Sequence, residues 1–198
     1  MKIAAMAAML VAVGMSARAE QTVKVYIEDD SVVPYLVMNR ARLIAAKMFA
    51  GAGVRIEWHG HTPNGGQLPA GAVVIGLASH TPENLLPGAF ALALPYEGVH
   101  ITVFWDRVER KTCRATAPVV LAHVLVHEIT HILQRMERHS ESGVMKACWT
   151  IEDYAEMKWK PLPFTPEDID LIHRGLAKRA GVGTLDAAHS APGVEARQ

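Results

Sequence analysis

Residues 116–134 form the segment that most constrains how this chain can fold. Apolar side chains recur through it at helical spacing, Thr116 is suited to cap a helix, and Pro118 fits a first helical turn. The sequence therefore predicts a long, largely buried helix. His127 and His131 lie four residues apart in this segment, so their side chains leave the same face of the helix about one turn apart.

The spacing of these histidines suits a metal ion. Two imidazoles at positions i and i+4 of a helix can reach one tetrahedral zinc ion, and Glu128 projects beside them toward a water on the metal. Buried histidines and a carboxylate on an apolar helix also need polar partners. The pattern predicts His127 and His131 as zinc ligands and Glu128 as the catalytic base. His123, four residues earlier, is expected to pack or to support the ligands.

A catalytic zinc site takes a third protein ligand, and the residues alone leave several candidates. Glu137 and His139 follow the predicted helix closely, whereas Glu152 and Glu156 belong to a segment that could return on another helix. His139 reaches the zinc only if the helix ends after about Leu133, because a continuing helix would carry it around and along the axis. No glycine is present at that point to ease the turn.

The rest of the chain alternates strand and helix signals. A strand, an amphipathic helix and a second strand predict a β-α-β unit with parallel strands. Pro95 marks an edge strand before a turn near residues 97–98. Thr165 and Asp168 are expected to cap a last helix that Gly181 ends, with an irregular segment before it. The expected elements are strands at 22–29, 54–59 and 72–79, two strands within 90–105, and helices at 33–53, 116–133 and 164–181.

The stretch 127–145 resembles the metzincin clan of zinc metallopeptidases, whose pattern is H-E-x-x-H-x-x-G-x-x-H followed by a methionine turn. The sequence HEITH matches the first three positions, and HSESGVM at 139–145 resembles the third histidine and the methionine. Two positions depart from the pattern. Gln134 stands at the glycine position and Glu137 at the third-ligand position, so His139 comes two residues late.

The resemblance implies an α/β (α+β) zincin-like domain: a mixed twisted sheet with an antiparallel edge strand, an active-site helix and a C-terminal helix. It implies a zinc metalloendopeptidase with His139 as third ligand, Met145 as a hydrophobic floor under the metal, and the strand at 90–96 aligning an extended peptide. Tyr154 is expected to be packed rather than catalytic. Two other functions remain open: a domain that holds zinc and binds a peptide or envelope component without cleaving it, and a metal-free structural domain. The third ligand could also be Glu137 or, in a gluzincin-like site, Glu152 or Glu156.

Residues 1–19 are typical of an export signal. A positive start precedes a short apolar run, and the small residues Ala17 and Ala19 form a cleavage pattern. The mature chain would then consist of a domain at 20–181 and a flexible tail at 182–198. We expect it to be secreted or periplasmic, with no stable membrane span after cleavage.

Net charge limits the classes of binding partner, and the cysteine content raises the question of a disulfide. A formal net charge of zero gives no electrostatic case for binding nucleic acid or an anionic membrane. The expected partner is a peptide or protein substrate, and the expected state is a monomer. Cys113 and Cys148 would meet an oxidising compartment, and the sequence leaves open whether they form a disulfide or stay free. The segment 58–61, with two histidines, is expected to be a solvated loop.

Overall fold

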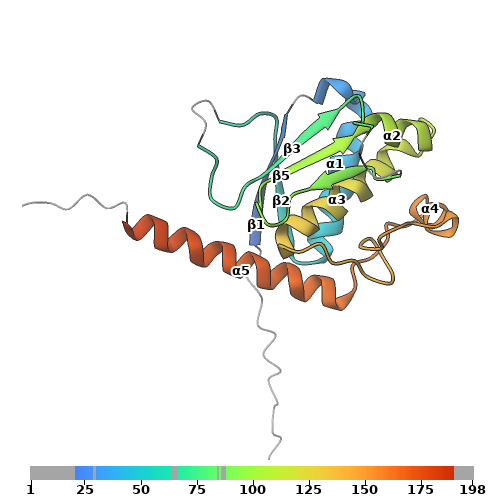
Figure 1. Cartoon of the computed structure of the whole chain (residues 1–198). Coiled ribbons are helices and arrows are strands. Elements are labelled where there is room, and N and C mark those ends of the chain that lie inside the picture. Colours follow the sequence, from blue (N-terminus) through green and yellow to red (C-terminus); the bar gives the residue numbers. More distant parts are fainter. Residues whose placement is uncertain (1–20, 29, 64–66, 84, 86–87, 190–198) are drawn as a thin grey trace, which may run out of the picture.

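The computed structural model describes residues 21–189 except 29, 64–66, 84 and 86–87, with side chains described up to Ala180 apart from that of Asp30. The predicted export signal lies outside the described residues, as does the end of the predicted tail. The described residues form a mixed α/β domain with one five-stranded sheet and five α-helices (Figure 1). This confirms the fold class predicted from the sequence.

The sheet has the strand order β2-β1-β3-β5-β4. Neighbouring strands are parallel except β4, which pairs antiparallel with β5 at the edge of the sheet. The predicted β-α-β unit and the antiparallel edge strand near Pro95 are therefore confirmed. The strands are β1 (Gln21–Glu28), β2 (Val54–His59), β3 (Val73–Ala78), β4 (Ala91–Ala93) and β5 (His100–Phe104).

The two faces of the sheet are covered differently. On one face, α1 (Tyr35–Gly51) and α3 (Ala117–Gln134) pack together over the main core, as Figure 1 shows. Alternate strand residues point to the other face, where Tyr26 and Val74 form a small cluster with Leu68 from the loop before β3. The site described below lies on the α3 side.

α3 lies in the centre of the main core. Sixteen of its eighteen residues are buried. By length and composition it could cross a membrane, but 89% of it is buried inside the fold, as a core helix is. The helix ends at Gln134, where the sequence required a break, and Arg135 adopts a left-handed conformation with φ of 57°. A non-glycine residue thus makes the turn, at a cost of about 1–2 kcal/mol.

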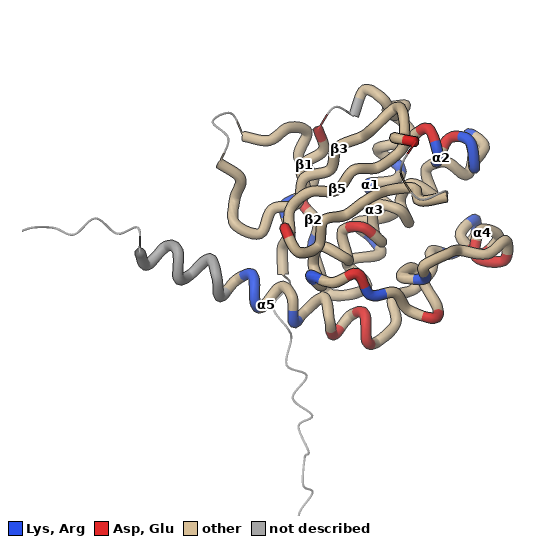
Figure 2. The backbone as a smooth tube through the Cα atoms, in the orientation of Figure 1, with Lys and Arg blue, Asp and Glu red and all other residues tan. Residues whose placement is uncertain are grey.

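A short helix, α2 (Trp105–Lys111), corrects the prediction for 90–105. The second strand was expected to extend through Trp105, but β5 stops at Phe104 and the chain turns directly into α2. A seven-residue helix shows too little periodicity to be distinguished from the end of a strand. Acidic and basic residues alternate along α2, and Figure 2 shows both colours along this part of the backbone.

The C-terminal part holds two further corrections. α4 (Ile151–Met157) forms where an irregular segment was predicted, although Thr150 and Asp153 make a capping box that could have indicated it. α5 (Pro166–His189) passes through Gly181, where its end was predicted. Glycine disfavours a helix by about 1 kcal/mol relative to alanine, which does not by itself end one.

The start of α5 agrees with the prediction and is joined to the end of α3. Asp168 N–H donates to Thr165 Oγ1 at 3.1 Å, and Thr165 N–H donates to Asp168 Oδ2 at 3.0 Å. Gln134 Nε2 donates to the Asp168 carbonyl oxygen at 3.2 Å. Gly175 permits the close approach, since a Cβ at that position would lie 1.8 Å from the Leu133 carbonyl oxygen. The two helices therefore fix the exit of the chain from α3.

Candidate metal centre

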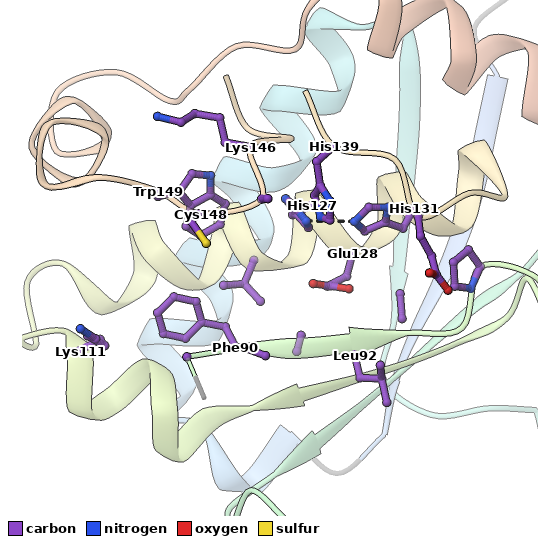
Figure 3. Close-up of a pocket in the computed structure, with 18 of the residues that line it drawn as sticks. Phe90, Leu92, Lys111, His127, Glu128, His131, His139, Lys146, Cys148 and Trp149 are labelled. Carbon is purple, nitrogen blue, oxygen red and sulfur yellow. Dashed lines mark hydrogen bonds between the residues drawn. The ribbon is translucent and has the colours of Figure 1, made fainter. Parts of the chain in front are cut away.

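His127 and His131 point to the same place from the buried face of α3 (Figure 3). Their Nε2 atoms lie 3.0 Å apart. Nδ1 of His127 lies 2.9 Å from the Val144 carbonyl oxygen, and Nδ1 of His131 lies 2.9 Å from the Met136 carbonyl oxygen. A carbonyl oxygen only accepts, so both Nδ1 atoms carry the proton and donate. Both Nε2 atoms therefore present lone pairs.

Facing lone pairs at this distance fit a cation between them. Burial holds the pKa of His127 at about 3 and that of His131 at about 4, so both rings are neutral near pH 7. With the proton on Nδ1, neither Nε2 has a hydrogen to donate across the contact drawn as a dashed line in Figure 3. Two nitrogens on a tetrahedral zinc ion lie roughly 3.4 Å apart, which is close to the separation in this pair.

His139 completes the group from the loop after α3. Its ring centroid lies 5.2 Å from that of His127 and 4.9 Å from that of His131. One ligand atom from each of the three histidines lies within 4.8 Å of the others, so the triad is able to hold a metal ion. His139 is exposed, whereas the other two are buried, which leaves an open side for water or substrate.

The rival third ligands lie outside this group. Among the described residues, the only cluster with metal-ligand geometry is the histidine triad. Glu137 lines the cleft beside it but is not part of the cluster. Glu152 and Glu156, both exposed, are on α4. The structure thus brings together the three histidines predicted from the motif and none of the three carboxylates.

Hydrogen bonds to α5 place the residues that flank His139. Ser140 Oγ donates to Asp168 Oδ1 at 2.6 Å, and Arg138 Nη1 donates to the same oxygen at 3.0 Å. Asp168 is fully buried. Burial alone would raise its pKa, but the hydrogen bonds from Ser140, Thr165 and Arg138 overcome this and hold the pKa below its usual value. A buried carboxylate on α5 therefore anchors the loop that carries His139.

The predicted methionine turn at Met145 is hydrogen-bonded to the start of the loop after His139. Ser140 N–H donates to the Met145 carbonyl oxygen at 2.8 Å, and the Met145 side chain is fully buried in the main core. The Val144 carbonyl oxygen accepts from His127 and, at 3.3 Å, from Trp149 Nε1. The backbone of this turn thus orients the His127 ring directly.

Glu128 extends from α3 beside the triad into a cleft (Figure 3). The edge strand β4 forms the opposite wall through Ala91, Leu92 and Ala93. Burial raises the pKa of Glu128 to about 7, and a hydrogen bond from the Ala93 backbone opposes that rise. A carboxyl group with a pKa near neutrality can both take up and release a proton at pH 7.

The cleft has a volume of about 620 Å³ and contains residues that the sequence did not single out. Trp149 is the main one: its ring lies edge-on to His127, with centroids 5.8 Å apart, and to Tyr154, with centroids 6.3 Å apart. Tyr154 lines the cleft and is half-buried. No local pattern marks Trp149 or Phe90 as cleft residues, because they come from segments far apart in the sequence and meet only in the fold.

Other histidines have structural roles. His123 is buried, with Nδ1 donating to the Val119 carbonyl oxygen at 2.7 Å and Nε2 accepting from Leu162 N–H at 3.0 Å. It is packed, as predicted. The segment 58–61 is a loop only in its second half, since His59 ends β2 and stacks on Tyr26.

The two cysteines are both free and exposed. The structure therefore holds two thiols where the sequence left a disulfide open. Cys148 lines the cleft, next to Trp149.

Comparison with known proteins gives a fold but no close relative. No protein-family profile matches the chain, and no curated protein is significantly similar to it in sequence. Among solved structures, the chain is similar to archaemetzincin from Methanopyrus kandleri, with 17% sequence identity and a TM-score of 0.55. The match covers 82% of this chain and 99% of that one. The similarity shows a shared zincin-like α/β fold, in agreement with the fold predicted from the motif.

Proposed function

We propose that this chain is a zinc metallopeptidase of the metzincin type, with His127, His131 and His139 as zinc ligands and Glu128 as the general base. The observation that carries the proposal is the convergence of the three ligand atoms beside Glu128 in a cleft walled by an edge strand. The fold shared with archaemetzincin supports it.

The chain's own groups suit peptide hydrolysis. Zinc held by the triad would polarise the scissile carbonyl and make a water molecule acidic near neutral pH. Glu128 takes the proton from the attacking water and delivers it to the leaving amine. Among the described residues β4 pairs with one strand only, β5. Its other edge, where the Ala93 backbone bonds Glu128, would hydrogen-bond an extended peptide. Such pairing would hold the substrate backbone in line with Glu128.

The proposal includes export and a peptide or protein substrate cleaved internally. Its basis is the signal-like pattern at 1–19, which would direct the mature chain to the periplasm or outside the cell. We expect the mature chain to act as a monomer. Mass spectrometry of protein secreted by a bacterial host tests the export step: a mature chain beginning at Glu20 is expected, and an intact N-terminus would contradict it.

Zinc content and peptide hydrolysis, measured together, test the activity. We expect the purified mature chain to bind one zinc ion and to cleave peptides from a mixed peptide library. Glu128→Gln should keep the zinc and lose roughly 10²- to 10⁴-fold in rate, because proton transfer is removed while the ligands stay. Glu141→Gln, an exposed residue of the same loop, is the matched control and should retain full activity.

Two outcomes would contradict the proposal. Zinc binding without cleavage of any library peptide would favour a domain that binds peptides without hydrolysing them. Failure to bind zinc after reconstitution would leave the histidines as structural residues.

A further inference from the structure

The cleft lining combines charged and aromatic groups. It includes the carboxylate of Glu137. Beyond His127, the wall is aromatic: the Phe90 and Trp149 rings stack with centroids 6.5 Å apart. Figure 3 shows Lys111 at this same end, across from Trp149. We call this region, lined by Phe90, Trp149 and Lys111, the aromatic end of the cleft.

Lys111 is the unpaired cation of the aromatic end. A second lysine, Lys146, also lines the cleft, but its amine pairs with Asp153 of α4. On α2, Arg110 pairs with Asp106, which leaves Lys111 without a salt bridge or hydrogen bond to any of the described residues. The aromatic end therefore carries one uncompensated positive charge.

Because the Phe90 and Trp149 rings form the walls of this end, few other groups there can bind a charged part of a substrate. The Phe90 side chain has no hydrogen-bonding group, and the Nε1–H group of Trp149 already donates to the Val144 carbonyl oxygen. The Cys148 thiol and the Tyr154 hydroxyl also line the cleft near Trp149, but Lys111 is the cation at this end that can pair with a substrate carboxylate. Lys111 is exposed, so its attraction for a carboxylate is that of a surface ion pair and is strongest at low salt.

We propose that the aromatic end of the cleft binds an apolar side chain of the substrate against Phe90 and Trp149, and an adjacent substrate carboxylate at Lys111. This inference rests on the proposed function and defines its substrate class: peptides that carry a carboxylate next to an apolar residue. The carboxylate comes either from an acidic side chain or from a free C-terminus.

The carboxylate of Glu137 adds to the preference. Because Glu137 also lines the cleft, it repels a substrate carboxylate placed beside it, whereas Lys111 attracts one.

A binding measurement on zinc-loaded Glu128→Gln protein tests the inference without turnover. The probes are four N-terminally labelled peptides of one sequence, measured by fluorescence anisotropy at low salt. Three are amidated and place Glu, Gln or Lys after a phenylalanine; the fourth ends on the same Phe-Gln pair with a free carboxylate. We expect the Glu peptide, the free-carboxylate peptide or both to bind about 3- to 5-fold more tightly than the amidated Gln peptide.

Substitutions of Lys111 identify the residue responsible. Lys111→Met should remove the preference, and Lys111→Glu should shift it toward the Lys peptide. Lys178→Met, which changes the net charge equally from an exposed position on α5, should leave the preference intact. The acidic-side-chain and free-terminus sources are distinguished by which peptide binds more tightly. Equal affinities for all four peptides, or a preference that survives Lys111→Glu, would overturn the inference.

The outcome is independent of the proposed activity. Hydrolysis by the parent protein with no carboxylate preference in binding would sink the inference and leave the peptidase. A carboxylate preference that depends on Lys111, in a parent protein that cleaves nothing, would support the subsite while contradicting the proposed function.

Discussion

The two halves of the histidine triad reach the same point by different means. His127 and His131 stand on a buried helix, where the helical period alone sets their separation. His139 comes from a loop whose course depends on the left-handed turn at Arg135 and on hydrogen bonds to Asp168, about thirty residues later. The helix half is thus defined locally and the loop half by tertiary contacts.

This difference indicates where the site is rigid and where it is adjustable. The helix pair stays in place as long as α3 does, and α3 is held by the whole core. The loop that carries His139 is held by the buried Asp168 of α5, through Arg138 and Ser140, and by a turn at Gly143. Perturbing each half separately should therefore change different properties of the protein.

Loss of a ligand gives the largest expected effect. His127→Ala and His139→Ala should each weaken zinc binding by more than the roughly 10- to 100-fold that losing an outer hydrogen-bond partner costs. His127→Ala should be the more severe, because His139→Ala leaves two ligands preorganised on one helix. Competition with a coloured chelator measures both affinities, and His61→Ala, exposed in another loop, is the control. The reverse order would show that the loop supplies the dominant ligand.

Removal of the loop's anchor should have the next largest effect. Asp168→Asn keeps the side chain's shape but loses the charge that Arg138 pairs with, so the loop is held less firmly. We expect zinc affinity to fall by about 10-fold, at the low end for an outer partner of a ligand. Asp170→Asn, exposed on the same helix, should bind zinc like the parent. A fall in melting temperature without any change in zinc affinity would limit Asp168 to a structural role.

The glycine beneath the loop offers a test by backbone strain. Gly143 has φ of 76°, and a Cβ there would lie 2.2 Å from the Pro163 carbonyl oxygen. Gly143→Ala should lower the free energy of unfolding by about 1–3 kcal/mol in urea titrations. Gly51→Ala, which has no atom within 4 Å of the added carbon, should be neutral or slightly stabilising. Equal stabilities of the two variants would show that the turn relaxes without cost.

Lowering the pH should have the smallest effect of the four, a loss of the stability that the Asp168 anchor contributes. The pKa of Asp168 is below its usual value of 3.8, so its contribution to stability is complete above that value and is lost as pH falls through the folded pKa. Zinc-free parent and Asp168→Asn should differ most in free energy of unfolding at about pH 6 and converge toward about pH 3. Histidine titration cancels in the difference except at His127, whose pKa the Asp168 charge raises as the last of several causes. A constant gap across this range would mean that Asp168 is not held ionised by its partners.

The sequence by itself determined the elements whose signals are local. Helical periodicity predicted α1 and α3, and capping residues predicted the start of α5. Strand patterns predicted β1 and β2, and the spacing of His127 and His131 placed both on one face. The same local reasoning predicted that the helix must end before His139, although it could not say which residue would turn. It failed at α2 and α4, which are too short to show a period, and at Gly181, where the helix continues.

Only the tertiary structure decided which distant groups meet. The choice of His139 over Glu137 in the ligand cluster follows from the Arg135 turn and the Asp168 anchor, and neither has a periodic signal. Trp149, Phe90 and Lys111 likewise come from three separate segments and share one end of the cleft only because β4, α2 and the methionine turn pack around α3. Local periodicity specifies which side chains share a face, whereas long-range packing and hydrogen bonds specify which faces meet.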